Sequence, residues 1–490
     1  MGRNKIHFVD LCQGEFGRKT AYTGVAQITT ENVIQVLSDT IGIHNRNRKM
    51  IDYLYRYYKG DQPILYREKL VRPEVNNRVV ENHALEVVKF KAGQIYGEPI
   101  QYVCKKKKAS TEINEQVDLL NDYLDEANAD ARNIQLGIYQ SAVGTAYKAI
   151  LREDEWTEDG DLPPFRIFIP YPGDVYIVYS RNTGKAMLSV HTLKDEENQQ
   201  YYLCFSSKQY FEIRNGKIID SGINGMGGIP IIEYPNNHDR LSDVEIAITM
   251  YDAINKYQSD RLNGVEQFVQ AFMKFKNCEV DENEFLKMVK LGAISVKDTG
   301  SGMQSDVDLM TAELNQSESQ VAKDDLYNNM LIVEAMPNRQ SNTGGDTGNA
   351  VYLRNGWDFA ERDAKLVEAF TKEAEKESAR IILNIIRKTS KDVKISTRDF
   401  DVKITRNPTD NMLVKAQALD YLFKNKIHPL IALITCGLFS DPQKVYEMSL
   451  PYLGTIYPEL ADPDTEMQRA QDLLKGFNQN TPTVTQTVKE

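Results

Sequence analysis

Hydrophobic positions in the first part of the chain recur at three- and four-residue intervals, which is the spacing of one face of a helix. Between residues 31 and 58 this spacing predicts two short helices, the second of which ends before Gly60. The same spacing predicts further helices over residues 80–96 and 111–127. Between them, residues 100–104 alternate between apolar and polar side chains and are predicted to form a strand.

The pattern changes over residues 134–236, where short alternating runs such as "FRIFIPY" and "DVYIVYS" predominate. Turn sequences such as "RNTGK" and "RNGK" separate these runs. This texture predicts a β-rich part that is inserted among helices.

Helical spacing returns over residues 242–276, and it predicts one long helix of about 50 Å from the rise of 1.5 Å per residue. Ser242 and Glu245 form the pattern of a capping box at its start. Residues 277–310 are predicted to form a small helix, a short strand and a polar loop, and a second helix is predicted over 311–336. A helix as long as the first rarely packs within one small domain.

A polar stretch, "PNRQSNTGGDTGNAVYLRNGW", separates this second helix from the next one. It is rich in Gly, Asn, Thr and Ser, and it exceeds the two to eight residues of an ordinary connection between helices. Two adjacent glycines, Gly344 and Gly345, allow the backbone to change conformation without loss of an apolar core. The composition predicts a mobile loop.

The helix after this stretch repeats apolar and small residues at alternating spacings of four and three from Leu353 to Ile385. Because the middle positions are small, we favour close packing on neighbouring elements over an autonomous coiled coil. Two alternating strands are predicted near residues 392–408, followed by helices over 411–475 with breaks at Pro429, Gly437 and Pro451. The polar C-terminal tail is predicted to be disordered.

The composition limits the class of protein. Hydrophobic residues make up 41% of the chain, and no apolar run is long enough to span a bilayer. The N-terminus lacks the apolar core of a signal peptide, so we expect the protein to stay in the cytoplasm where it is made. The formal charge of −11 argues against a protein that grips nucleic acid by neutralising many phosphates, but not against one past which nucleic acid slides.

Motifs for catalysis or metal binding find little support. There is no P-loop, and "GINGMGG" has the wrong spacing for a dinucleotide loop. The five cysteines and six histidines show no metal-binding spacing, and "EDEWTEDGDL" resembles a calcium loop only in its acidity. We therefore expect no cofactor, no metal and no enzymatic activity. Composition and motifs alone lead to a soluble, acidic α+β protein with unusually long helices.

Two segments, "YLYRYYKGDQPILYRE" and "NNRVVENHALEVVKFKAGQIYGEPIQYV", closely resemble the portal proteins of tailed double-stranded DNA bacteriophages. In that family a helix ends in Tyr-Tyr-x-Gly, and an Asn-Arg-Val/Ile-Val-x-Asn segment starts the next helix, which closes in Gly-x-Pro-Val/Ile-x-Tyr. The matching positions here are Tyr57, Tyr58, Gly60, Asn77, Arg78, Val79, Val80, Asn82, Gly97, Pro99, Ile100 and Tyr102. The resemblance extends over roughly residues 31–450, and it departs from the family at "GNAVYL", where many relatives have Ser-Gly-Val/Ile-Ala-Leu.

The resemblance implies an α+β portal fold assembled as a ring, usually of twelve subunits, at one vertex of the capsid. The family's parts map onto an N-terminal arm (1–30), a mixed α/β wing (31–241) with its β-rich part (134–236), stem helices (242–276 and 311–337), a small α/β clip (277–310), a tunnel loop (338–349), a wing helix with strands (350–408), a helical crown (409–475) and a disordered tail (476–490).

The resemblance also implies which residues face DNA. The tunnel loop would comprise Asn338, Arg339, Gln340, Ser341, Asn342, Thr343, Gly344, Gly345, Asp346, Thr347, Gly348 and Asn349. Lys274, Lys276, Arg339 and Arg354 are candidates for transient phosphate contacts, and the alternative for each is an intersubunit or solvent-facing charge. An acidic lining would otherwise hold DNA away from the wall and favour sliding.

The implied partners are other copies of the chain, double-stranded DNA, an ATP-driven terminase, major capsid and scaffolding proteins, and head–tail connector proteins, with no membrane. The implied location is the virion, and the host cytoplasm during assembly. Two alternatives stay open: a nucleic-acid-processing enzyme of the phage head, which its many carboxylates would allow, and an adaptor ring that carries no DNA.

Overall fold

A computed structural model describes residues 7–70, 73–105, 111–153, 163–269, 272–276, 281, 283, 306–310, 316–338, 356–389, 393–406, 412–439 and 442–453. The chain divides into two compact units, residues 1–406 and 407–490. Most of the predicted tunnel loop, from Arg339 to Asn349, lies outside the described residues, as do Arg354 and the tail.

The first unit begins with helices that pack closely together. They are α1 (Phe8–Cys12), α2 (Val33–Tyr58), the short 3-10 helix η1 (Pro63–Tyr66), α3 (His83–Tyr96), α4 (Thr111–Glu126) and α5 (Ala129–Val143). The prediction of two helices within 31–58 is wrong, because α2 is continuous through Gly42. Its buried face runs without interruption from Val33 to Tyr57, and this packing outweighs the cost of about 1 kcal/mol for one glycine in a helix.

A six-stranded sheet follows, in the order β1-β5-β6-β7-β8-β9. Its strands are β1 (Ala21–Thr23), β5 (Val175–Ser180), β6 (Ala186–Lys194), β7 (Gln200–Phe205), β8 (Gln209–Arg214) and β9 (Lys217–Ile223). β1 pairs in parallel with β5, and the remaining neighbours pair antiparallel. The predicted N-terminal arm therefore contributes a strand to this sheet.

A second sheet has the order β10-β3-β4 and consists of β3 (Thr145–Arg152), β4 (Phe165–Phe168) and β10 (Ile231–Pro235). The β-rich part thus begins at Thr145, and the prediction of strands from residue 134 is wrong because α5 continues to Val143. Gly144 makes the turn between them with φ of +85°, and a Cβ there would lie 2.0 Å from the carbonyl oxygen of Arg240. Only glycine fits this junction.

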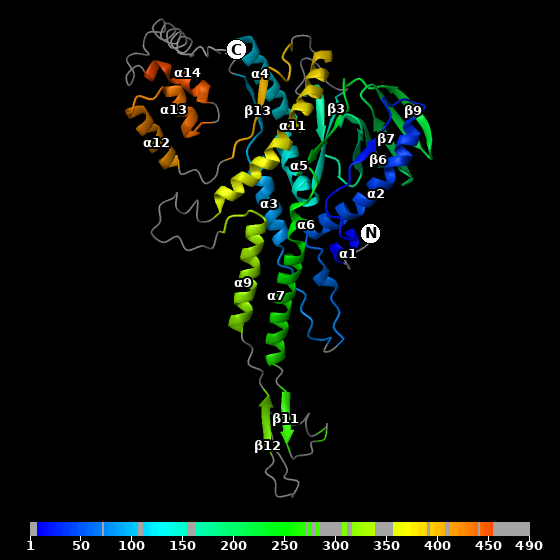
Figure 1. Cartoon of the computed structure of the whole chain (residues 1–490), viewed down its shortest axis with the longest axis vertical. Coiled ribbons are helices and arrows are strands. Elements are labelled where there is room, and N and C mark those ends of the chain that lie inside the picture. The colour runs from blue at the N-terminus through cyan, green and yellow to red at the C-terminus, as the bar shows by residue number, and fades with distance from the viewer. Residues whose placement is uncertain are drawn as a thin grey trace, which may run out of the picture. The chain divides into compact units, whose positions relative to one another are not determined.

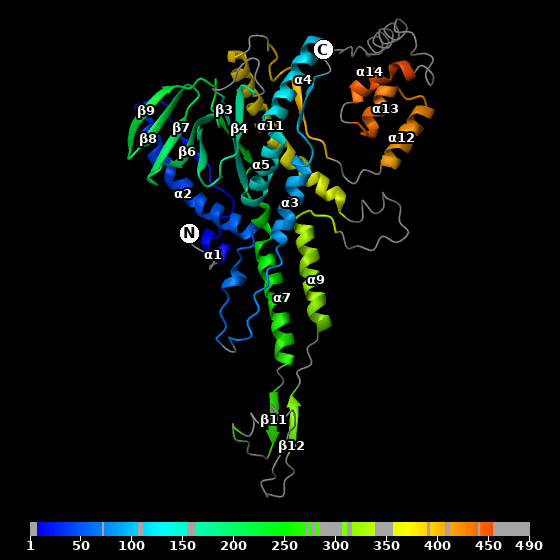
Figure 2. The same cartoon turned by 180° about the vertical axis from the view of Figure 1, so that it is seen from behind.

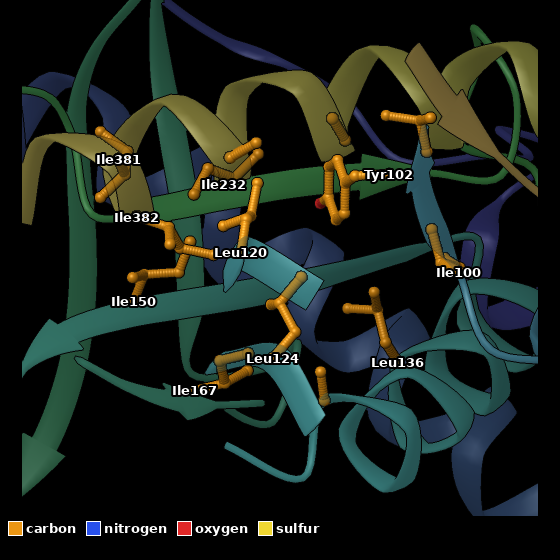
Figure 3. Close-up of a cluster of buried hydrophobic side chains, with 14 of the residues drawn as sticks. Ile100, Tyr102, Leu120, Leu124, Leu136, Ile150, Ile167, Ile232, Ile381 and Ile382 are labelled. Atoms are coloured by element: carbon orange, nitrogen blue, oxygen red, sulfur yellow. The ribbon is translucent and has the colours of Figure 1, made fainter. Parts of the chain in front are cut away.

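The long helix α11 (Trp357–Thr389) covers β10 and β3, as Figures 1 and 2 show. Its predicted small-residue seam is confirmed from Ala360 onwards: the seam positions that are buried are Ala360, Ala364, Thr371, Ala374, Ser378, Ile381 and Ile385, whereas Trp357 and Val367 are half-buried and Leu353 lies outside the described residues. The main core lies between α11, α4, α5 and this sheet (Figure 3), and it includes Leu120, Leu136, Ile150, Ile232 and Ile382. Of the two strands predicted after α11, the described residues contain one, β13 (Phe400–Lys403), which pairs with β2 (Gln101–Cys104).

The single helix predicted over residues 242–276 is wrong in two places. Ser242 caps the short helix α6 (Asp243–Ile246), and Ala247 then leaves helical geometry before α7 (Ile248–Val269) begins. Phe272–Lys276 form strand β11, which pairs antiparallel with β12 (Asp306–Met310). Pairing with a strand 30 residues away leaves no signature in the local spacing of apolar residues. The prediction therefore continued the helix through residues that form β11.

The second unit contains α12 (Met412–Lys424), α13 (Pro429–Cys436) and α14 (Pro442–Leu453) around a small core with Leu433 and Tyr446. Pro429 starts α13 and Gly437 follows its end, as predicted. The predicted break at Pro451 is wrong, because α14 continues to Leu453. No helix in the described ranges is both long and apolar enough to cross a membrane.

Candidate functional site

Two helices, α7 and α9 (Gln316–Val333), lie side by side in both views of the molecule (Figures 1 and 2). They run antiparallel, since residues of increasing number on α7 contact residues of decreasing number on α9. The Tyr251 hydroxyl donates to Glu334 Oε1 (3.0 Å), Lys323 Nζ donates to Gln258 Oε1 (3.2 Å), and Arg261 bonds Gln320. We call α7 and α9 the helix pair. Polar contacts join its two members at three levels.

Apolar side chains on the helix pair remain exposed in the single chain. On α7 they are Tyr257, Leu262 and Val265, and on α9 they are Val321, Ile332 and Val333. Val321 is 69% exposed and Ile332 is 75% exposed. Apolar side chains this exposed on two adjacent helices are candidates for a contact with another subunit.

The family motif residues near Asn77 form a strap along α7. The backbone N–H of Asn77 donates to Asn263 Oδ1 (2.7 Å), that of Val79 to Ser259 Oγ (3.0 Å), and that of Glu81 to Asn255 Oδ1 (2.8 Å). Asn255, Ser259 and Asn263 are buried and stand four residues apart on one face of α7. Alternate N–H groups of an extended segment are thus satisfied by successive turns of a helix. We call residues 77–81 the strap.

Asn82 ends the strap and caps α3. Its Oδ1 accepts from the backbone N–H of Leu85 (3.2 Å), and its Nδ2 donates to the Tyr58 carbonyl (2.9 Å). Gly60 turns the chain with φ of +95°, and a Cβ there would lie 3.5 Å from Asn82 Nδ2. The Tyr57 hydroxyl donates to Asp252 Oδ1 of α7 (2.8 Å). The motif therefore joins the end of α2, the start of α3 and α7.

The remaining motif positions also have structural roles. Arg78 Nη1 donates to the Leu65 carbonyl (2.9 Å), and this bond links the two ends of the connection between η1 and the strap. The Gly97 N–H donates to the Gly93 carbonyl at the end of α3, and Pro99 follows in an exposed position before β2.

The described residues nearest the predicted tunnel loop are Asn338, its first residue, and Gly356, seven residues beyond its last. Asn338 Nδ2 donates to Asn328 Oδ1 of α9 (3.0 Å). Gly356 has φ of +83°, and a Cβ on it would lie 3.7 Å from the Met336 carbonyl oxygen. The chain therefore leaves the end of α9 and enters α11 at neighbouring places. Whether the loop residues contact DNA stays a prediction.

Lys274 and Lys276 lie on β11, where the strand register sets them opposite Asp308 and Asp306 of β12. This alternation of charge across the two strands was missed by the sequence analysis, which treated residues 272–276 as helix. Their assignment as phosphate contacts also stays a prediction.

A buried charge cluster at the end of the helix pair was also missed. Lys91 of α3 bonds Asp363 of α11, and it is electrostatically coupled to Asp243 of α6 and to Glu334, which follows α9. Burial raises the pKa of Glu334 well above its ordinary value, and the nearby Asp243 carboxylate raises it further. These residues are far apart in sequence, so no local motif announces them. Elsewhere too, the described residues contain no group of three or more His, Cys, Asp or Glu that could hold a metal ion.

The family described as "Phage portal protein, SPP1 Gp6-like" matches residues 37–450, and the chain belongs to it. It is therefore a component of the virion head and a member of a structural family.

Among individual proteins, the chain is similar to the portal protein of Bacillus phage SPP1. The two are 21% identical over 433 residues, which cover 82% of this chain and 77% of the relative. Among solved structures, it matches a chain from the neck of a native GTA particle computed with C12 symmetry, with a TM-score of 0.43 and 12% identity, over 73% of this chain and 89% of the other.

Proposed function

We propose that this chain forms the ring-shaped channel through which double-stranded DNA enters and leaves the phage head, with no catalytic activity of its own. The observation that carries the proposal is the family match, which runs without interruption through the strap, the helix pair and α11. A terminase would supply the energy for packaging, and capsid, scaffolding and head–tail connector proteins would bind the ring.

The exposed apolar residues of the helix pair support assembly. A ring places each subunit against two neighbours through a repeated heterologous contact, and the rotation closes the assembly without a free end. Val321 and Ile332 on α9, together with Tyr257 on α7, would be covered in such a contact. This explains why the chain leaves them exposed.

The polar segment 338–349 supports passage of DNA. We propose that it lines the channel, because it follows α9 and the described residues that flank it, Met336 and Gly356, lie close together. Its side chains, as read from the sequence, are polar and carry few charges, which suits a polymer that must slide. Arg339, Arg354, Lys274 and Lys276 would contact phosphates transiently.

The first experiment measures assembly. Native mass spectrometry and negative-stain imaging of the full chain should show a closed ring, expected to contain twelve subunits, with an axial hole. Val321→Asp on α9 should favour smaller species, whereas Asn329→Asp, an exposed polar position on the same helix, should leave the ring intact. A wild-type protein that is a stable monomer would contradict the proposal.

The second experiment measures DNA passage. Replacement of residues 340–347 by a shorter Gly-Ser segment should preserve the ring but lower the number of DNA-filled heads in a complementation assay. Unchanged filling would favour an adaptor ring. Metal-dependent DNA cleavage by the purified chain, abolished by removal of one carboxylate cluster, would favour the enzyme.

A further inference from the structure

The charge cluster at the end of the helix pair contains three carboxyl groups and one ammonium group. Lys91 contacts Asp363 directly, while Asp243 accepts hydrogen bonds from Ser141 Oγ (2.5 Å) and Asn236 Nδ2 (3.0 Å). Glu334 is only 2% exposed, and the hydrogen bond recorded to its carboxyl group comes from the Tyr251 hydroxyl. The cluster thus joins α3, α6, α7, α11 and the end of α9.

The charges in this cluster do not balance. The charged and titratable groups that face Glu334 are Asp243 from α6, Lys91 from α3, Tyr251 from α7 and Asp363 from α11. If all three carboxyl groups were ionised, one lysine would have to offset them, and two of them, Asp243 and Glu334, are buried, while the Asp363 side chain is 35% exposed. Asp363 has the ion pair and Asp243 has two donors, whereas Glu334 has one neutral donor. Glu334 is therefore the carboxyl group that most readily stays protonated.

Glu334 also occupies a special place in the chain. It is followed by Ala335, whose φ is +50°, and by buried Met336, whose carbonyl oxygen lies beside Gly356. Directly after Gly356, α11 begins with Trp357, whose ring centroid lies 6.0 Å from that of Phe90 on α3. Asp363 is one to two turns further along α11. The cluster therefore contacts both elements that flank the segment between α9 and α11.

We propose that Glu334, Tyr251, Lys91 and Asp363 are positioning residues that hold the end of α9 against the start of α11, and that protonation of Glu334 controls this contact. When Glu334 is neutral, the cluster is close to charge balance and the two ends stay together. When it ionises, repulsion from Asp243 and Asp363 loosens the turn at Ala335 and Met336. The contact itself does not depend on the proposed function. Only an effect of this contact on DNA passage would rest on that function, because the predicted tunnel loop between α9 and α11 would line the channel.

Trp357 provides a spectroscopic test. The chain has two tryptophans, and a Trp156→Phe background leaves Trp357 as the sole reporter at the start of α11. In the full-length protein its emission should shift to the red as the pH rises, because ionisation of Glu334 exposes the start of α11. Glu334→Gln should remove most of this shift, since glutamine keeps the volume and cannot ionise. The matched control, Glu81→Gln, removes a carboxylate that contacts α9 through Lys323 outside the cluster, and it should leave the shift unchanged.

A second variant keeps the proposal testable if Glu334→Gln does not fold. Tyr251→Phe keeps the aromatic ring of the side chain and removes the hydroxyl that stabilises ionised Glu334. The midpoint of the emission change should therefore move up by about one pH unit. Absence of a pH-dependent emission change in the parent, or the same change in Glu334→Gln, would overturn the proposal. A failure of DNA filling in the wild type would instead contradict the channel function, and it would leave this emission result standing.

Discussion

The sheet body, formed by β3, β10 and α11, and the helix pair differ in what they bury. The body buries an apolar seam and the ion pair of Lys148 with Glu375, and Glu375 also accepts from the Tyr102 hydroxyl (2.8 Å). Phe359 and Leu366 on the outer side of α11 stay exposed. The helix pair places polar contacts between its members and leaves Val321 and Ile332 in solvent. The body thus holds an enclosed ion pair, whereas the helix pair is joined by partly solvated polar contacts and carries apolar residues in solvent.

The difference also separates two kinds of charge pair. Lys148 and Glu375 are fully enclosed, and Lys148 lies 4.9 Å from the Tyr234 ring centroid. Lys323 of α9 forms an ion pair with Glu81 of the strap, and both side chains are partly exposed to solvent. The enclosed pair is expected to matter far more when one member is removed, because an uncompensated buried charge is costly.

The largest expected effect tests this contrast directly. Lys148→Met should lower the free energy of unfolding by about 3–5 kcal/mol, because Glu375 is left buried without its cation. Lys323→Met should lower it by at most about 1 kcal/mol. Urea unfolding followed by circular dichroism measures both. Equal losses would remove the distinction, and a Lys148→Met, Glu375→Met double variant should recover much of the stability.

The next effect concerns how the free energy of unfolding depends on pH. Replacing His44 and replacing His83 should change this dependence in opposite directions. Burial lowers the pKa of His44 to about 4, and its Nε2 lies 2.9 Å from the Gly173 carbonyl oxygen. Since the unfolded state binds a proton near pH 6.5, His44 costs up to about 3 kcal/mol of stability as the pH falls from there towards 4. His44→Gln should therefore make the protein less sensitive to acid, as measured by urea unfolding between pH 7 and 4.5.

His83, which contacts the helix pair through Tyr327, provides the contrasting control. Burial opposes its charge, but Glu81 and Glu86 together raise the pKa of His83 above the ordinary value. Its contribution is then present below pH 6.5 and is lost as the pH rises through the folded pKa. His83→Gln should make the protein more sensitive to acid. The same sign for both variants would contradict the assigned environments.

A smaller effect concerns the strap. Asn255→Ala leaves the backbone N–H of Glu81 without its acceptor, and it should lower the free energy of unfolding by about 1–3 kcal/mol. Lys256→Ala, at the next and exposed position on α7, should change it by less than about 0.5 kcal/mol. Hydrogen exchange should also be faster for the Glu81 amide in Asn255→Ala. Unaltered exchange would show that the strap is held by other contacts.

The smallest effect on folding is expected at the exposed apolar surface. Ile332→Ala on α9 should change the subunit's free energy of unfolding by less than about 0.5 kcal/mol, while it weakens ring assembly in native mass spectra. The matched change in the sheet body, Ile232→Ala, should cost about 2–5 kcal/mol because it opens a cavity. If Ile332→Ala were equally destabilising, the helix pair would belong to the subunit core.

Local patterns predicted the elements that depend on local contacts. α3, α4 and the seam of α11 followed from apolar spacing, and the Ser242 cap followed from the capping-box pattern that Ser242 forms with Glu245. Elements that depend on distant pairing were missed: β1 finds its partner in β5, and β11 finds its partner in β12. Local spacing carries no information about such partners.

The same limit applies to the candidate site. The motif residues Asn77 and Asn82 were identified, but not their role, because their partners lie on distant or preceding elements. One signal was present in the sequence. Asn255, Ser259 and Asn263 recur at four-residue intervals, which places three polar residues along one face of a helix that was predicted from its apolar spacing. The charge cluster gave no such signal, since Lys91, Asp243, Glu334 and Asp363 come from four separate elements.

The strap can be only a few residues long, because the extended chain and the helix advance by different distances from one hydrogen bond to the next. Four residues of helix advance about 6.0 Å, whereas two residues of extended chain advance about 6.6 Å. Each further hydrogen bond therefore drifts by about 0.6 Å, and beyond the three observed bonds the mismatch approaches the tolerance of a hydrogen bond. An insertion of one residue between Asn77 and Glu81 would present the wrong N–H groups to α7, so this short motif fixes both the spacing and the register of the chain on the helix.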